Sequence, residues 1–159
     1  MYQRAPRGAG VVLRAALPRG IVGARSGAWV AYRPFRLHGA AYGGLVGPIG
    51  DAARFLAAHL NDGAFDGSRI LAPATARQMR EITMPGRPYY LGLGWFHRAN
   101  GHPGAPRFVE HLGGGLGVYN TMRLYPDLGL GVVVMANSPG YDLEAVITPV
   151  VAAATAGHL

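Results

Sequence analysis

The spacing of apolar residues changes along the chain, from a helical period in its middle to strict alternation further on. In PIGDAARFLAAHLNDG, residues 48–63, apolar positions recur at helical spacing and predict an amphipathic helix. Asp51 can stabilise its first turn, and Asn61 and Gly63 are expected to end it. The predicted buried stripe consists of Phe55, Leu56, His59 and Leu60.

A second helix is predicted in APATARQMREI, residues 72–82, after a turn and a short extended piece in FDGSRIL. Pro73 suits the first helical position, where its missing N–H costs nothing. Met79 and Ile82 would form the buried side of this helix.

After residue 88 the apolar residues alternate with a period of two. This predicts strands over residues 89–98, 107–113, 118–126 and 130–137, the last one apolar enough to be covered on both faces. DLEAVITPVVAAATAG then predicts a closing helix with a kink at Pro149. The expected fold class is α+β, with an antiparallel meander flanked by helices.

Residues 1–40 are expected to form an irregular, basic segment that precedes the domain of residues 41–159. Pro6, Pro18 and Pro34 interrupt it. VVLRAAL could form one or two helical turns, and AWVAYRPFRL a short strand ended by its proline.

The charge of the chain comes entirely from arginine and is unevenly distributed. All 15 basic residues are Arg, the net charge is +7, and no acid precedes Asp51. A GC-rich genome would also favour arginine. The arginines are dispersed and no nucleic-acid motif accompanies them, so nucleic-acid binding is not expected.

No apolar run approaches the ~18 residues of a membrane span. The absence of cysteine excludes disulfides and thiolate chemistry and leaves the compartment open.

The common nucleophile and cofactor motifs are absent. Ser26, Ser68 and Ser138 are the only serines; none lies in G-x-S-x-G, and without lysine none can lie in S-x-x-K. GGLVGPIG and GGGLG do not match a phosphate-binding loop. His97, His102 and His111 fit no zinc spacing, so no metal or other cofactor is expected.

His111 stands out because glycines follow it directly in RFVEHLGGGLGVYNTMRLYP, residues 107–126. Glycines at the end of a strand let a ligand lie against the backbone, where N–H groups can receive an oxyanion. A histidine there could also simply hydrogen-bond a loop carbonyl. The sequence leaves both interpretations of His111 open.

The pattern H-x-G-G, YPDLGLGVVVMANS and the closing helix resembles the C-terminal part of class C β-lactamase-like serine hydrolases. That family includes DD-peptidases, D-aminopeptidases and esterases. YGGLVGPIGDAARFLAAHLNDG, GSRILAPATARQM and YYLGLGWFHR are similar to family segments in the same order, so the resemblance covers about residues 30–152. It implies a partial β-lactamase/transpeptidase-like fold.

The family has three motifs, S-x-x-K, Tyr-x-Asn or Ser-x-Asn, and K-T-G or H-x-G. The resemblance implies a site on the third motif, which His111-Leu112-Gly113 matches with His111 at the lysine position. It implies that the Gly114 N–H is one half of an oxyanion hole, and that Leu112, Gly113 and Gly115 line the substrate. Leu112 replaces the usual hydroxyl residue, which shifts the expected substrate from β-lactams toward esters or other uncharged acyl groups. S-x-x-K and Tyr-x-Asn are absent, since Tyr119 and Asn120 are adjacent.

The expected function is therefore that of a C-terminal part of a serine hydrolase that cleaves an amide or ester through an acyl-enzyme. These residues alone are expected to be inactive. The partners would be a small acyl substrate, and an N-terminal half of the fold or a second copy bound at the last strand. The alternative is a non-catalytic binding or regulatory module that retains half of the site.

Overall fold

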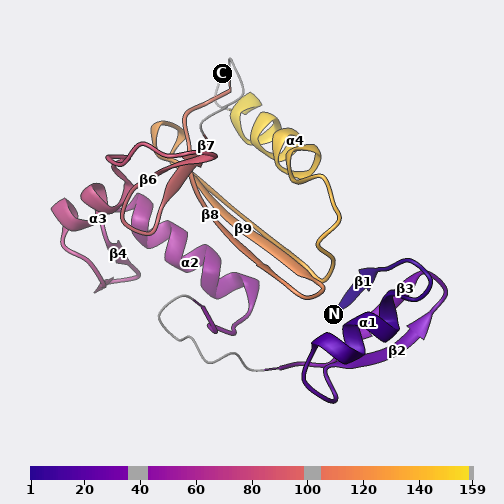
Figure 1. Cartoon of the computed structure of the whole chain (residues 1–159). Coiled ribbons are helices and arrows are strands. Elements are labelled where there is room, and N and C mark those ends of the chain that lie inside the picture. Colours follow the sequence, from indigo (N-terminus) through magenta and orange to yellow (C-terminus); the bar gives the residue numbers. More distant parts are fainter. Residues whose placement is uncertain (36–42, 99–104, 158–159) are drawn as a thin grey trace. The chain divides into compact units, whose positions relative to one another are not determined.

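The chain is described by a computed structural model that covers residues 1–35, 43–98 and 105–157. Figure 1 shows its helices and strands in chain order. The contacts define two compact units. One consists of Met1–Val46, Gly113–Asn120 and Met135–Pro149, the other of Gly47–Leu112, Thr121–Val134 and Val150–Leu159. The domain boundary near residue 40 stays a prediction.

The N-terminal segment forms a small sheet with one helix, so the expectation that it is irregular as a whole was wrong. Its elements are β1 (Tyr2–Arg4), α1 (Ala9–Ala16), β2 (Val22–Ser26) and β3 (Trp29–Tyr32), with strand order β1-β3-β2. The helical turns considered for VVLRAAL and the short strand considered for AWVAYRPFRL are confirmed. Pro6 and Pro18 lie in the connections on either side of α1, so they mark the ends of elements rather than preventing them. Val30 and Tyr32 are at the centre of its core.

The helix predicted over the middle of the chain is α2 (Ile49–Leu60), and Asn61 is its C-cap as expected. Leu56 and His59 are buried, whereas Phe55 is 38% exposed, so the buried stripe is narrower than predicted. A two-stranded hairpin follows, with β4 (Ala64–Phe65) and β5 (Ser68–Arg69).

The second helix, α3 (Pro73–Arg80), begins at Pro73 as predicted. Its most buried residue is Ala76, which is 0% exposed, whereas Met79 and Ile82 are only half-buried. The small alanine allows close packing at the centre of the contact, and the two larger residues lie at its margin.

The main sheet has the strand order β10-β9-β8-β7-β6. The strands are β6 (Tyr89–Leu91), β7 (Phe96–Arg98), β8 (Val109–Gly115), β9 (Val118–Tyr125) and β10 (Leu130–Ala136). The single strand predicted over residues 89–98 is a hairpin instead. Gly94, with φ +82°, allows the turn, and at Gly92 a Cβ would lie 2.5 Å from the Glu81 carbonyl oxygen.

The last strand and helix agree with the sequence pattern in position. A 3₁₀ turn at Pro126–Leu128 joins β9 to β10, and α4 (Leu143–Ala156) closes the chain with Pro149 inside it. Of β10, only Val132 is buried, and Met135 is 42% exposed, so the expectation that both faces are covered was wrong. β10 is the end strand of the sheet order, and one side of it has no neighbouring strand within the described ranges.

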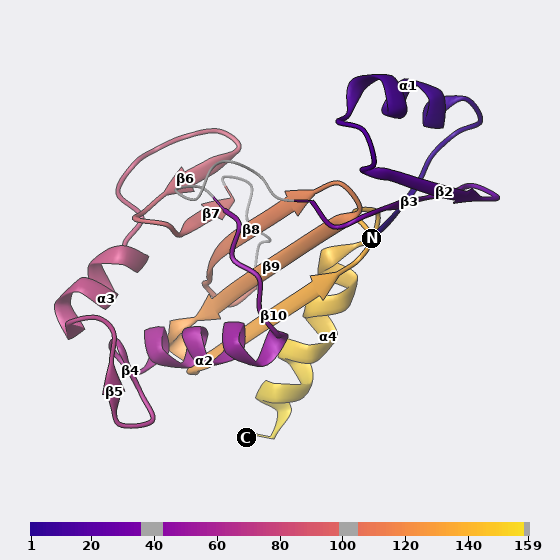
Figure 2. The same ribbon diagram turned by 90° about the horizontal axis from the view of Figure 1, so that it is seen from below.

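The core of the second unit forms where α2 packs on the sheet (Figure 2). Leu56 of α2 joins Trp95, Val109 and Leu124 in one buried cluster. A Cβ at Gly131 of β10 would lie 3.1 Å from the Leu56 Cβ, so glycine allows the helix to lie close to the strand.

Candidate functional site

The predicted site residues lie together on one strand. His111 to Gly115 are the last five residues of β8, in the hairpin that β8 and β9 form (Figure 1). Val109 and Glu110 are buried, whereas His111 and the three glycines are exposed and Leu112 is half-buried. β7 pairs with β8 only at Phe96–Glu110, so among the described residues the ladder on that side ends just before His111.

The His111 ring is held in one orientation by the turn before β7. Its Nδ1 lies 3.0 Å from the Gly94 carbonyl oxygen, and the Phe96 ring is 5.5 Å away between centroids. A carbonyl oxygen only accepts hydrogen bonds, so Nδ1 must carry the proton. In the neutral ring Nε2 is then a hydrogen-bond acceptor, on an exposed side chain.

The three glycines leave the end of β8 bare. A Cβ at Gly113 or Gly114 would find its nearest atoms at 3.9 Å (Asn120 Cβ) and 3.7 Å (Tyr119 Cδ2), which are ordinary contacts. Neither residue has a positive φ. Among the described residues, therefore, neither packing nor backbone conformation requires glycine at these two positions. At Gly115 the nearest atom would be closer, at 3.3 Å.

The turn that follows does require its glycine. Gly117 has φ +69°, and a Cβ there would lie 2.9 Å from the Tyr2 backbone nitrogen. The backbone thus requires glycine at Gly117, whereas it does not require glycine at Gly113 and Gly114 on β8.

A buried ionic cluster adjoins His111, and the sequence reasoning missed it. Glu110, 0% exposed, accepts hydrogen bonds from Arg98 Nε at 2.9 Å and from Arg123 Nη2 at 2.8 Å. Arg123 is 1% exposed, and its guanidinium carbon lies 4.0 Å from the centroid of the Phe108 ring. The signal was present, because a carboxylate in a buried strand needs a partner, and each adjacent strand carries one arginine.

A second buried polar residue is His59 on α2, whose burial the sequence predicted as part of the helix stripe, whereas the lack of partners for its ring was not predicted. It is 0% exposed, and neither ring nitrogen has a hydrogen-bond partner among the described residues. Its ring packs at centroid distances of 4.7 Å from Phe55 and 5.2 Å from Trp95. Burial, and secondly the charge of Arg80, lower the pKa of His59.

Tyr119 and Asn120, the two residues most similar to the absent Tyr-x-Asn motif, form hydrogen bonds that hold neighbouring segments. Asn120 Oδ1 accepts the Ala136 N–H at 3.2 Å, and the Tyr119 carbonyl accepts the Tyr141 hydroxyl at 3.0 Å. Burial, and secondly Tyr119, raise the pKa of Tyr141, so this phenol remains a donor.

Among the residues that the structure describes, no group of three or more His, Asp or Glu side chains is arranged to hold a metal ion. His97 Nδ1 lies 3.0 Å from the Phe108 carbonyl oxygen, and His102 lies outside the described residues. No helix in the described part of the chain has the length and hydropathy needed to cross a membrane.

Comparison with known families identifies the class of this protein. A family model described as Beta-lactamase matches residues 4–156, which is nearly the whole chain. The chain therefore belongs to the beta-lactamase family, a serine-hydrolase-like family, and its α+β structure agrees with that class. No protein with a curated description matches it.

Proposed function

We propose that this chain supplies one side of a serine-hydrolase site, the substrate wall formed by His111 to Gly115 on β8, with acyl transfer to water as the reaction. In that reaction a serine attacks an amide or ester carbonyl, the amine or alcohol leaves as the acyl-enzyme forms, and water then hydrolyses the acyl-enzyme to release the acid. Gly114 would donate its N–H to the oxyanion, and His111 would hold the substrate or accept a proton through Nε2. Leu112, Gly113 and Gly115 would line the acyl group.

The observation that carries this proposal is the bare end of β8. Glycine is present at Gly113 and Gly114 although ordinary space exists for a side chain. A strand whose β7 ladder ends at Glu110 can present its backbone N–H groups to a ligand there. A donor of this kind typically contributes about 3 kcal/mol to transition-state stabilisation.

We further propose that the 159 residues are inactive alone, because they include neither S-x-x-K nor Tyr-x-Asn. The purified chain should hydrolyse neither nitrocefin nor p-nitrophenyl butyrate above the buffer rate. Saturable turnover that is lost in His111→Gln would contradict this and would mean that another nucleophile operates.

The substrate wall itself is testable without turnover. Titration of the ¹⁵N-labelled chain with N-acetylalanine methyl ester should shift the amide signals of Gly113 to Gly115. Gly114→Ala should abolish the shifts, whereas Gly140→Ala, at another glycine with free space around its Cβ position, should not. Unchanged binding by Gly114→Ala would show that the ligand does not lie against β8.

The partner proposal concerns β10, the end strand of the sheet order. We propose that a polypeptide carrying S-x-x-K, or a second copy of the chain, pairs with this strand. Light scattering should show self-association, and Met135→Pro should suppress it by removing one backbone donor from the free side, since the N–H of the next residue, Ala136, points to Asn120 of β9. A monomer at high concentration that does not respond to this change would contradict the second-copy form.

The alternative function is a binding module that uses the same wall without catalysis, and the absence of S-x-x-K from these residues favours it. The two functions differ when an S-x-x-K polypeptide of the family is added. Ester hydrolysis that requires both chains supports the enzyme, whereas ester binding without hydrolysis in the mixture supports the module.

A further inference from the structure

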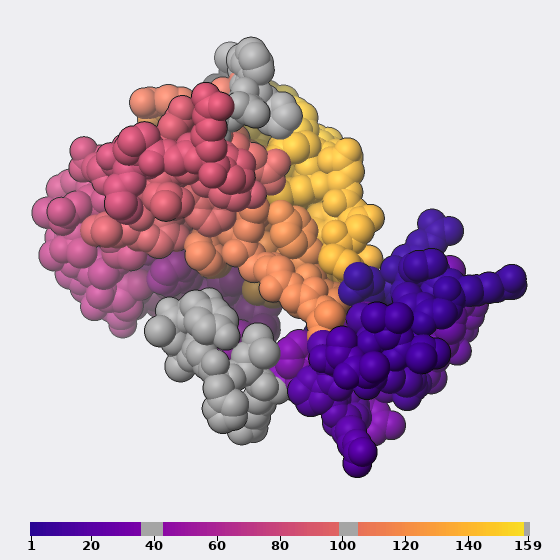
Figure 3. All heavy atoms as spheres, in the orientation of Figure 1, coloured from indigo at the N-terminus to yellow at the C-terminus, as the bar shows by residue number. Residues whose placement is uncertain are grey.

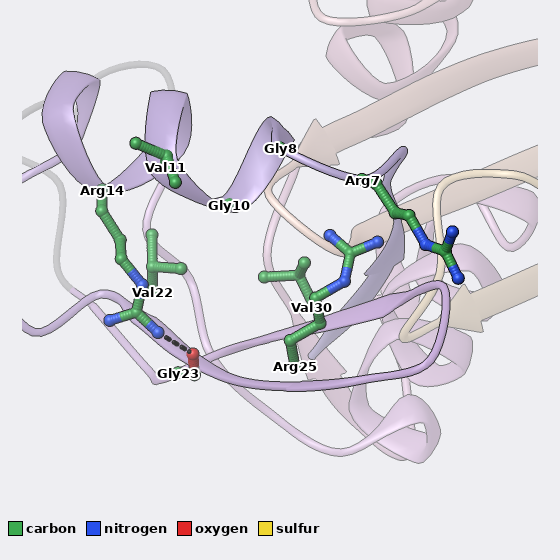
Figure 4. Close-up of a pocket in the computed structure, with 9 residues that line it drawn as sticks. All are labelled: Arg7, Gly8, Gly10, Val11, Arg14, Val22, Gly23, Arg25 and Val30. Carbon is green, nitrogen blue, oxygen red and sulfur yellow. Dashed lines mark hydrogen bonds between the residues drawn. The ribbon is translucent and has the colours of Figure 1, made fainter.

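A groove in the N-terminal unit lies between α1 and the β2–β3 hairpin (Figure 4). It has a volume of about 270 Å³ and is lined by valine, glycine and arginine residues. All of its lining residues come from residues 7–30, within a single compact unit. It is separate from the strand proposed above as the substrate wall.

Two arginines mark the ends of this groove. Arg14 reaches from α1 and donates to the Gly23 carbonyl at 2.8 Å. Arg25 extends from β2 toward the start of α1 and donates to the Ala5 and Pro6 carbonyls at 2.8 and 3.0 Å. These bonds fix both guanidinium groups in place, and each group retains further N–H donors.

The charge of these arginines is not balanced within the unit. Carbonyl oxygens accept hydrogen bonds but carry no formal charge, and no carboxylate of the described residues forms an ion pair with Arg7, Arg14 or Arg25. The only acidic residues in this unit are Asp142 and Glu144. Figure 3 shows long side chains projecting from the N-terminal segment into solvent. The local field therefore attracts anions.

The middle of the groove is apolar. Val22 and Val30 form its floor and are 8% and 1% exposed, and Val11 of α1 forms one wall while remaining 74% exposed. An exposed valine over a valine floor leaves apolar surface that a bound hydrocarbon would cover. The volume of about 270 Å³ holds roughly nine water-sized groups, which suits a small molecule.

We propose that this groove binds a small amphiphilic anion, with an oxyanion head on Arg14 or Arg25 and a short hydrocarbon tail against Val11, Val22 and Val30. Arginine matches the planar geometry of carboxylate and phosphate oxygens. Because the guanidinium groups are already fixed by backbone carbonyls, little side-chain entropy is lost on binding. A concave site of this size takes one molecule, whereas nucleic acid would need an extended basic surface.

Two neighbouring valines provide a matched pair of variants for the test. Val11 lines the groove and Val12 does not, yet they are 74% and 68% exposed on the same helix. Val11→Glu places a carboxylate in the groove and breaks no hydrogen bond, while Val12→Glu makes the same change of charge outside it. Neither residue is in the core, so both variants should fold, which the amide spectrum would verify.

The probe is octanoate, titrated into the ¹⁵N-labelled chain in 0.15 M salt, where the Debye length is about 8 Å. Octanoate should shift the amides of the groove residues. Val11→Glu should weaken binding at least tenfold, Val12→Glu at most about threefold, and Arg14→Gln about fivefold. Acetate and octanol should each bind at least tenfold more weakly than octanoate. Octyl phosphate distinguishes a phosphate from a carboxylate head.

Several results would overturn the proposal. Equal weakening by Val11→Glu and Val12→Glu would show that general charge attraction, and not the groove, binds the probe. Acetate as tight as octanoate would indicate an adventitious ion only, and octanol as tight would remove the role of the arginines. Retention on duplex DNA or on phosphatidylglycerol vesicles, equally affected by both valine variants, would assign the surface to a polyanion.

Discussion

Replacement of Glu110 by alanine should destabilise the chain more than any surface change, because Glu110 is the carboxylate that two arginines share. It is 0% exposed and accepts from Arg98 at 2.9 Å and from Arg123 at 2.8 Å. Without it, Arg123 keeps a positive charge at 1% exposure, with a tyrosine hydroxyl and the face of Phe108 as neighbours. Breaking a buried pair in this way typically costs about 3–5 kcal/mol.

The cost should lie near the middle of that range, at about 4 kcal/mol, because Arg98 is 33% exposed and can be solvated whereas Arg123 cannot. Urea unfolding followed by the fluorescence of Trp95, which is 3% exposed, would measure it. Asp127→Asn is the control, because it weakens the exposed Arg107–Asp127 pair and should cost less than about 1 kcal/mol. A loss of under about 1 kcal/mol in Glu110→Ala would refute the reasoning, because it would mean that water or other neighbouring groups stabilise Arg123 without Glu110.

Three further predictions concern single residues. Folded His59 has a lowered pKa, so below about pH 6.5 the unfolded chain binds a proton that the folded chain does not. The free energy of unfolding should therefore fall by up to about 1.4 kcal/mol for each pH unit below that value. Urea unfolding at several pH values would measure this, and His59→Phe should not show the part of the pH dependence that comes from His59. Gly117→Ala should destabilise by more than about 1 kcal/mol through its positive φ and contact with Tyr2, whereas Gly114→Ala should stay within about 0.5 kcal/mol in the same assay. Long-range ¹H–¹⁵N spectra of neutral His111 should show the proton on Nδ1, and a proton on Nε2 would disprove the Gly94 bond.

The sequence predicted those elements whose apolar spacing and end signals agree. α2 combines a helical stripe with Asn61 and Gly63 at its end, and α3 begins at a proline. The predictions from the sequence were wrong where glycine and proline connect short elements. The β1–β3 sheet was expected to be irregular, and a turn at Gly94 divides a predicted single strand into β6 and β7. The strands in both places have five residues or fewer, and α1 has eight. Such short elements do not establish a period of apolar residues in the sequence.

The candidate site was predicted as consecutive residues, because local sequence does not show which distant residues contact them. His111 to Gly115 are consecutive, so a strand brings them together without further information. The groups that hold this strand come from elsewhere in the second unit. Gly94 fixes the His111 ring from 17 residues away, and Arg98 and Arg123 reach Glu110 from 12 and 13 residues away. Those contacts depend on strand order, which the pattern of apolar residues does not specify.

The geometry also bears on the two interpretations of His111 that the sequence left open. The ring does hydrogen-bond a loop carbonyl, as a purely structural histidine would, but that bond uses only Nδ1. A purely structural role does not explain why the His111 side chain, with its Nε2 acceptor, is exposed. It also does not explain glycine at Gly113 and Gly114, where a Cβ would meet only ordinary contacts. Both features have one explanation if a ligand lies along the end of β8, with the histidine oriented toward it by Gly94. If Gly113 and Gly114 accept alanine without loss of stability while ester binding is lost, the structural interpretation no longer accounts for this strand.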